Sequence, residues 1–264
     1  MSVLVAADLD QTLIYSRRAM ARWGGGECAV AAVETYQRVD SAFMTASAAA
    51  SLAVLAERAL VVPTTTRTPE QLARVRLPGP PVRYAVAANG GIVLVDGVPD
   101  AGWTNSVRAG LNGSAPLADV HDHAEAICAP QWTKLLRTAC DLFCYAVLER
   151  DRVPAGLVAA ETAWAAERGW RVSLQGRKLY WVPQALTKSA AIAEIARRTG
   201  SATVLAAGDS LLDTDLLAAA DRGITPRHGE LVASGWQAPH VEVTDGCGLA
   251  AGEEIVDWFA ANVR

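Results

Sequence analysis

The sequence predicts an α/β protein whose core is a parallel sheet, with a smaller α+β domain inserted into it. Short apolar runs alternate with helical stretches in both terminal regions of the chain. Uninterrupted apolar runs are typical of strands buried on both faces, and strand–helix alternation is typical of parallel sheets. The alternation stops over residues 101–182, so we expect an inserted domain there. The core domain would then comprise residues 1–100 and 183–264.

The N-terminal region supplies the first strands of the expected sheet. Apolar runs predict strands at 3–7 and 59–62, and the alanine-rich stretch 45–57 predicts the helix that connects them. Two further runs, at 84–88 and 92–95, enclose an Asn-Gly-Gly turn and predict another strand followed by a hairpin.

The inserted region and the C-terminal region each have their own pattern. In the insert we expect two helical stretches and a strand before Pro154, then a helix and a hairpin around Gly176. Strand–helix alternation returns after Pro183. The elements expected there are helices at 187–199, 211–220 and 253–262 and strands at 203–207, 223–225 and 241–244.

Composition excludes several classes of protein. With 264 residues, 20% of them charged, the chain is long enough for a sizeable core and is not typical of disorder. A net charge of −4 gives no reason to expect nucleic-acid binding, and no apolar run is long enough to span a membrane. Five cysteines without a paired pattern, and no recognisable signal peptide, favour a reduced cytoplasmic protein. The sequence specifies no oligomeric state.

Two pairs of aspartates follow strands that we expect in the core. Asp8 and Asp10 come directly after the first strand, and Asp209 and Asp213 come after a later one. Ligands of an open α/β sheet bind at the carboxyl ends of its strands, so both pairs should contribute to one site. Carboxylates this close repel one another unless a cation neutralises them, and an all-oxygen site suits Mg²⁺.

A threonine and a lysine complete this expected site. Thr65 follows the second strand and offers a hydroxyl group to a phosphate oxygen. Lys188 stands where a helix is expected to begin. A cation there opposes the helix dipole unless an anion is shared between them. Both positions therefore favour a bound phosphate group.

Together these motifs resemble, in order, those of the haloacid dehalogenase (HAD) superfamily of phosphotransferases. The matching segments are Asp8-Leu9-Asp10-Gln11-Thr12, Thr65, Lys188 and Gly208-Asp209-Ser210-Leu211-Leu212-Asp213. Three further segments extend the resemblance to subclass IIB, which contains Cof-type and sucrose-phosphate phosphatases: Asn89-Gly90-Gly91, the run Leu179 to Lys188, and Thr244-Asp245-Gly246. The resemblance implies a Rossmann-like core with an α+β cap of the C2 type that closes over the site and excludes water.

The resemblance also implies an activity: Mg²⁺-dependent hydrolysis of a small phosphomonoester, with sugar phosphates as the leading class. Asp8 would be the nucleophile that forms an aspartyl-phosphate, and Asp10 the general acid and then the general base. Thr65 and Lys188 would hold the phosphoryl oxygens. The implied Mg²⁺ ligands are Asp8, Asp10 (through its backbone carbonyl) and Asp209, and Asp213 would contribute directly, through water or through Lys188.

Three positions depart from the pattern of the superfamily. Gln11 stands where a glycine is common, and Thr66 replaces the usual glycine before Arg67. Leu212 stands where Cof-type proteins usually have an asparagine, so an amide is missing from the surroundings of the metal. Ser210 or Asp215 are the side chains that could compensate for it.

Some residues have two interpretations. Arg67 is either a substrate or phosphate contact or a loop arginine in solvent. Asn89 is either a substrate contact or a turn residue that binds its own backbone. A group of acidic and histidine side chains in the insert is either a metal site or a solvated helix start. Its members are Asp119, His121, His123 and Glu125.

Three other functions use similar residues. Phosphoryl transfer to an acceptor other than water, as in a mutase, needs the same motifs as hydrolysis. A non-catalytic phosphometabolite-binding protein is the second alternative, with Leu212 as its only indication. A receiver-type signalling domain is the third, but receivers are much shorter and lack a general acid at the position of Asp10.

Overall fold

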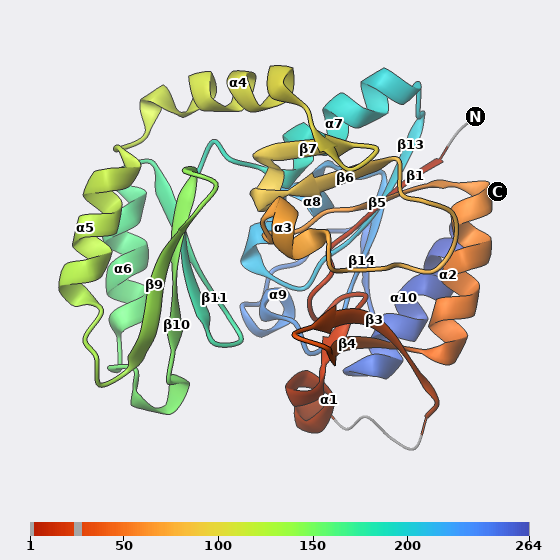
Figure 1. Ribbon diagram of the computed structural model, residues 1–264, viewed down its shortest axis with the longest axis horizontal. Helices are drawn as coiled ribbons and strands as arrows, with labels where there is room; N and C mark the ends of the chain where they lie inside the picture. Colours follow the sequence, from red (N-terminus) through yellow and green to blue (C-terminus); the bar gives the residue numbers. More distant parts are fainter. Residues whose placement is uncertain (1–2, 24–27, 264) are drawn as a thin grey trace. The chain divides into compact units, whose positions relative to one another are not determined.

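The chain folds into two units, and a computed structural model describes its residues 3–23 and 28–263. The first unit contains Met1–Asp100 and Lys188–Arg264, and the second contains Ala101–Thr187. A parallel sheet lies in the first unit and a separate antiparallel sheet in the second (Figure 1). The expected fold class, an α/β core with an inserted α+β unit, is confirmed.

A five-stranded parallel sheet of order β15-β14-β13-β1-β5 forms the centre of the first unit. Its strands are β1 (Val3–Ala7), β5 (Leu60–Pro63), β13 (Thr203–Ala207), β14 (Arg222–Thr225) and β15 (Val241–Val243). Ala7, at the end of β1, lies opposite Pro63 of β5 and Ala207 of β13. The chain adds β5 on one side of β1 and later adds β13 on the other. Ligands of open α/β sheets bind at such a switch in strand order.

The first unit also contains helices. They are α1 (Arg17–Trp23), α2 (Ala46–Arg58), α3 (Pro69–Leu72), α7 (Lys188–Thr199), α8 (Thr214–Ala219), α9 (Glu230–Ala233) and α10 (Leu249–Asn262). The hydroxyl of Thr45 accepts from the backbone N–H of Ala48 and so caps α2. Helices α2 and α10 pack against each other (Figure 1). The last helix begins four residues before the expected start at Glu253, directly after Gly248, whose φ is +59°.

Two small antiparallel sheets belong to the same unit. One has the order β2-β4-β3 and the other β6-β7-β8. Their strands are β2 (Tyr15–Ser16), β3 (Val30–Tyr36), β4 (Val39–Thr45), β6 (Tyr84–Ala87), β7 (Ile92–Val95) and β8 (Val98–Pro99). A parallel bridge between Thr64 and Val86 joins β6 to the chain just after β5. Both sheets therefore arise from segments that follow the carboxyl ends of β1 and β5.

The second unit is an antiparallel sheet of order β11-β12-β10-β9 with three helices. Its elements are α4 (Ala101–Gly110), α5 (Leu117–Ile127), β9 (Thr133–Ala139), β10 (Phe143–Leu148), α6 (Leu157–Ala166), β11 (Trp170–Gln175) and β12 (Lys178–Pro183). Phe143, Trp170 and Trp181 are fully buried, so aromatic side chains fill its core. Strand β9 is not expected from the sequence, because only one of its seven side chains is buried.

Candidate active site

Three aspartates lie together beyond the ends of β1 and β13. Asp8 follows β1 directly, Asp209 lies two residues after β13, and Asp213 ends the short 3₁₀ helix η4 (Leu211–Asp213). Each offers a carboxylate oxygen within 4.8 Å of those of the other two, and all three residues are buried. The structure thus brings together three of the residues that the sequence predicts for the site.

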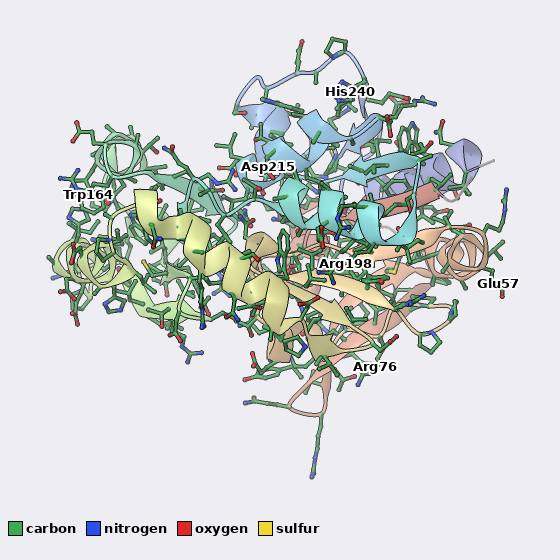
Figure 2. The ribbon with its side chains drawn as sticks, turned by 90° about the horizontal axis from the view of Figure 1, so that it is seen from above. Glu57, Arg76, Trp164, Arg198, Asp215 and His240 are labelled. Atoms are coloured by element: carbon green, nitrogen blue, oxygen red, sulfur yellow. The ribbon has the colours of Figure 1, made fainter. Side chains whose placement is uncertain are left out.

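Lys188 joins this aspartate cluster from the start of α7. Its Nζ lies 2.6 Å from Oδ1 of Asp8 and 2.5 Å from Oδ1 of Asp213, and the residue is 1% exposed. The backbone N–H of Ser189 donates to Oδ2 of Asp215 at 2.8 Å, beside the start of α7 (Figure 2). An acidic side chain at this helix start offsets the unfavourable effect of the lysine on the helix dipole.

Burial and mutual repulsion shift the pKa values of the cluster. Burial raises the pKa of Asp8 to about 7; Lys188 counteracts this rise and Asp213 adds to it. The pKa of Asp209 is well above its usual value because of burial first, then the charges of Asp8 and Asp213. Burial lowers the pKa of Lys188, but its two carboxylate partners outweigh that effect, so the net shift is upward. The lysine therefore stays charged, and it only partly compensates the aspartates.

The aspartate cluster fits a divalent metal ion. Three ionised carboxylates and one ammonium group leave two negative charges in a buried space, which an ion of charge +2 would neutralise. All the ligand atoms offered are oxygens, the preference of a hard cation such as Mg²⁺.

Local sequence features hold the aspartates in place. A Cβ atom on Gly208 would overlap the Cβ of Asp213, so only glycine allows this close approach. The backbone N–H and the hydroxyl of Ser210 donate to Oδ2 of Asp213 at 3.0 and 2.8 Å. Thr12, which is fully buried, donates from its hydroxyl to Oδ1 of Asp209 at 3.4 Å. These contacts orient both carboxylates before any ion binds.

The departures from the superfamily pattern have a structural account at two positions. Gln11 has a φ of +67°, in the left-handed region that favours glycine, and it still forms the turn. Its carbonyl accepts from the Tyr15 hydroxyl at 3.0 Å and lies 3.1 Å from Nε2 of His228. Leu212 is fully buried. Of the two proposed substitutes for its missing amide, Ser210 supports Asp213 and Asp215 binds the start of α7.

Thr65 lies in a tight turn after β5. The residue is 1% exposed, and its hydroxyl accepts from the backbone N–H of Arg67 at 3.2 Å. The backbone N–H of Asn89 donates to the Thr65 carbonyl at 2.9 Å. Asn89 is buried, with a φ of +55°, in the 3₁₀ turn η1 (Ala88–Gly90). Since β5 neighbours β1, this turn lies at the same sheet edge as Asp8.

A second charged group contains Asp10 and Arg67. Nε and Nη2 of Arg67 donate to Oδ2 and Oδ1 of Asp10 at 2.7 and 2.8 Å. Nη1 and Nη2 of Arg67 also donate to Oε1 and Oε2 of Glu34 at 2.9 and 3.1 Å. Arg67 is 9% exposed, so its interpretation as a loop arginine in solvent is wrong.

Sequence reasoning missed two residues near the site. Glu34 escaped notice because it stands as a single acid in a strand-like segment of no evident function. His228 escaped notice because it lies in a loop after β14. Nδ1 of His228 accepts from the backbone N–H of Gly248 at 3.1 Å, and burial lowers its pKa. The ring thus joins the turn at Gln11 to the start of α10.

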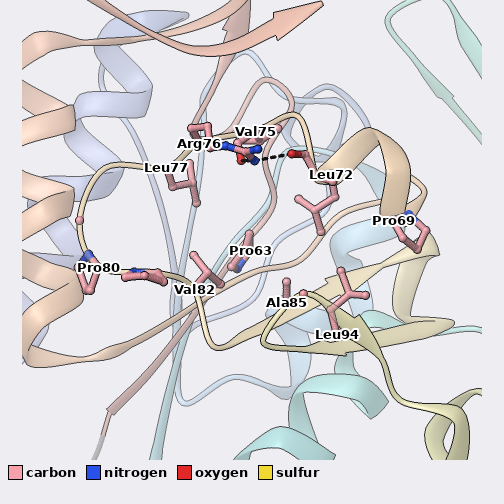
Figure 3. A pocket seen from close by; sticks show the side chains of 14 residues that line it. Pro63, Pro69, Leu72, Val75, Arg76, Leu77, Pro80, Val82, Ala85 and Leu94 are labelled. Carbon is pink, nitrogen blue, oxygen red and sulfur yellow. Dashed lines mark hydrogen bonds between the residues drawn. The ribbon is translucent and has the colours of Figure 1, made fainter.

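Two other features hold none of the residues expected to form the Mg²⁺ and phosphate site. A cavity of about 440 Å³ beside α3 is lined mainly by prolines and aliphatic side chains (Figure 3). Among the described residues that line it, Arg76 is the charged one. In the second unit, His121, Asp122 and Glu125 offer ligand atoms within 4.8 Å of one another at the surface. His123 lies instead against Glu161, 3.0 Å from Nε2 to Oε2. Neither feature has the buried acids of the aspartate cluster.

The chain shares its fold with proteins of known structure. The chain has the fold of the subclass IIB HAD phosphatases, and its buried aspartates lie at the sheet edge that binds ligands in such folds. No protein-family model matches the sequence, and no curated protein matches it either. Within residues 3–23 and 28–263, no helix combines the length and the hydropathy that a membrane span requires.

Several solved structures have the same fold as this chain. The sucrose-phosphatase of Synechocystis sp. PCC6803, in complex with sucrose and phosphate, matches with a TM-score of 0.65 at 14% identity over 98% of each chain. The HAD subclass IIB sugar phosphatase BT4131 matches with a TM-score of 0.60 at 12% identity over 100% of both chains. BT1666 from Bacteroides thetaiotaomicron, a HAD phosphatase, matches with a TM-score of 0.54 at 13% identity over 98% of this chain and 95% of its own.

Proposed function

We propose that this protein is a Mg²⁺-dependent phosphatase that hydrolyses a small phosphomonoester through an aspartyl-phosphate. The observation that carries the proposal is the buried cluster of Asp8, Asp209 and Asp213 around Lys188, at the switch in strand order. A surface group of acids would not require a buried lysine among three buried carboxylates, since unpaired charges in such a place are costly.

In the proposed reaction Asp8 is the nucleophile. A carboxylate oxygen of Asp8 attacks phosphorus, and the bond from phosphorus to the ester oxygen breaks. Asp10 gives a proton to the departing alcohol and then accepts one from the water that attacks the phosphoenzyme. The P–O bond to Asp8 breaks in this second step, which yields inorganic phosphate and restores both aspartates.

Thr65 and Lys188 are the proposed phosphate-binding residues. Lys188 brings a positive charge within 2.6 Å of the nucleophile, where charge on the phosphoryl oxygens has to be neutralised. Mg²⁺ would be held by Asp8, the backbone carbonyl of Asp10, Asp209 and Asp213. The ion would supply further neutralisation and orientation of the phosphoryl group.

The proposed substrate class is a sugar phosphate or a related phosphometabolite. Two proteins of the same fold support it: one is described as a sucrose-phosphatase bound to sucrose and phosphate, the other as a sugar phosphatase. We assign residues 101–182 to a cap domain that contributes to substrate recognition, with 1–100 and 183–264 as the core. Arg67 and Asn89 remain the proposed substrate-side residues of the core.

The test is phosphate release from a broad panel of phosphomonoesters, with Mg²⁺ and with EDTA. The proposal predicts Mg²⁺-dependent release from one substrate group, and none from the Asp8→Asn variant. Transfer of the phosphoryl group to a sugar without phosphate release would instead identify a mutase or another transferase. Binding without turnover would identify a non-catalytic phosphometabolite-binding protein.

A further inference from the structure

Glu34 belongs to a chain of three side chains that ends at Asp10. The Arg67 guanidinium lies between the two acids and donates two hydrogen bonds to each, over 2.7 to 3.1 Å. The side chains of Glu34 and Arg67 are 7% and 10% exposed, whereas that of Asp10 is 49% exposed. Glu34 and Arg67 are therefore enclosed by the protein, whereas Asp10 is half-exposed to solvent.

The backbone of β3 is built to point Glu34 inward. Val33 and Glu34 are consecutive and both buried, which a regular strand does not allow because its side chains alternate. The pairing of β3 with β4 shifts register on both sides of Glu34, which marks a β-bulge. Bulges re-aim side chains and are frequent next to active sites. A bridge from Glu34 to Val75 fixes the same residue from its other side.

The charges of this group are balanced. Nε of Arg74 lies 3.2 Å from Oε1 of Glu34, so two arginines face two acids. Glu34 and Arg74 compensate each other, which leaves the positive charge of Arg67 for Asp10. A buried acid is costly unless it is paired, and an apolar residue would fill this position without that cost. Packing alone therefore does not explain why a glutamate occupies this position.

We propose that Glu34 is a positioning residue for Asp10: it holds Arg67, and Arg67 holds both carboxylate oxygens of Asp10 in the orientation that serves the leaving group. The inference rests on the proposed function, in which Asp10 gives the proton to the departing alcohol. A half-exposed aspartate rotates freely without such a partner, and the planar fork of an arginine restricts both of its oxygens at once. Small misplacement of a catalytic group is enough to slow a reaction by about a hundredfold.

The experiment compares Glu34→Gln and Arg67→Lys with wild type on two substrates. The quantity measured is kcat/KM for a hexose 6-phosphate, whose alcohol needs a proton to leave, and for p-nitrophenyl phosphate, whose leaving group hardly needs one. We expect a fall of about ten- to a hundredfold for the hexose phosphate in both variants, and a change of less than about threefold for p-nitrophenyl phosphate. Arg67→Lys keeps the charge but loses the fork, so it separates orientation from charge.

Two controls separate positioning from damage to the fold. Glu57→Gln changes an exposed acid on α2 (Figure 2) and should leave both substrates at the wild-type rate. The inhibition constant of inorganic phosphate should change by less than about threefold in Glu34→Gln and in Glu57→Gln, since the proposed phosphate binding involves neither residue. Thermal unfolding shows which variants are folded. If Glu34→Gln does not fold, the comparison of Arg67→Lys with wild type tests the positioning role.

The outcomes distinguish this inference from the function on which it rests. An equal loss for both substrates, an unchanged rate, or a faster rate in Glu34→Gln would overturn the positioning role while wild-type turnover supports the phosphatase. Absence of phosphate release from wild type would overturn the proposed function, and the role of Glu34 with it.

Discussion

Lys188 and Asp8 are 180 positions apart in the sequence, yet the lysine Nζ lies 2.6 Å from Oδ1 of the aspartate. The same Nζ lies 2.5 Å from Asp213, so one ammonium group serves two carboxylates inside the first unit. This arrangement joins the start of α7 to the end of β1. It also leaves the aspartate cluster short of positive charge, which is the physical basis for the proposed metal ion.

Replacing Lys188 tests how much this buried pairing contributes to stability. Lys188→Met leaves three buried carboxylates without their cation, and we expect a loss of about 3–5 kcal/mol in the free energy of unfolding. Lys134→Met is the matched control, because Lys134 pairs with Glu149 at the surface and should cost less than about 1 kcal/mol. Urea unfolding at neutral pH measures both. Equal losses in the two variants would contradict a buried ion pair at Lys188.

The effect of Mg²⁺ on stability should depend on pH. The folded-state pKa of Asp8 is raised to about 7 and that of Asp209 is well above its usual value, so the folded chain holds protons that the unfolded chain releases. Without metal, these two groups lower stability as pH rises from about 4 through about 7. Because Mg²⁺ binds the ionised carboxylates, the increase in Tm on adding Mg²⁺ should be small near pH 5.5 and large near pH 8.

The matched variants for this measurement are Asp209→Asn and Asp257→Asn. Asp209→Asn should remove most of the Mg²⁺ effect, whereas Asp257→Asn, an exposed change on α10, should retain it. An increase in Tm that is the same at both pH values, or that persists in Asp209→Asn, would place the metal elsewhere.

Gly208→Ala tests the close approach of Asp213. An added Cβ atom would overlap the Asp213 side chain, so the loop has to shift, at a cost of about 1–3 kcal/mol. We expect the variant to lose the Mg²⁺ effect on Tm and most of its turnover. Gly110→Ala is the control: a Cβ atom there meets open space, and alanine favours the helix. A fully active Gly208→Ala enzyme would show that the position of Asp213 is not critical.

Asp10→Asn tests the proposed general acid. Because asparagine cannot give up a proton, kcat/KM for alkyl phosphates should fall by about 10²–10⁴, and far less for p-nitrophenyl phosphate. Phosphate release under conditions of low substrate concentration measures this ratio. An equal fall for both substrates would count against the general-acid role.

The sequence predicts the parts of the site that follow buried strands. Asp8 and Asp209 come after apolar runs that form neighbouring strands β1 and β13, so the sheet alone brings them to one edge. Lys188 is predictable because a lysine at a helix start needs an anionic partner. These residues depend on regular elements whose periodicity is visible in the sequence.

The remaining features depend on irregular backbone. Glu34 faces inward only because of the bulge in β3, and a bulge breaks the alternation from which burial is inferred. His228 reaches the turn at Gln11 from a loop 217 positions away, and nothing in its neighbours indicates that contact. Arginines in loops are usually exposed to solvent. Arg67 is buried because its guanidinium binds the buried carboxylate of Glu34.

The central claim is that Asp8 becomes phosphorylated, and mass spectrometry of the acid-quenched enzyme tests it most directly. In Asp10→Asn, p-nitrophenyl phosphate should still phosphorylate Asp8 while the water step lacks its base, so the phosphoenzyme should accumulate. The account predicts one added phosphoryl group on the peptide that contains Asp8, and none in Asp8→Asn. Phosphate release by wild type with no phosphorylated peptide, or with phosphate on another residue, would contradict it.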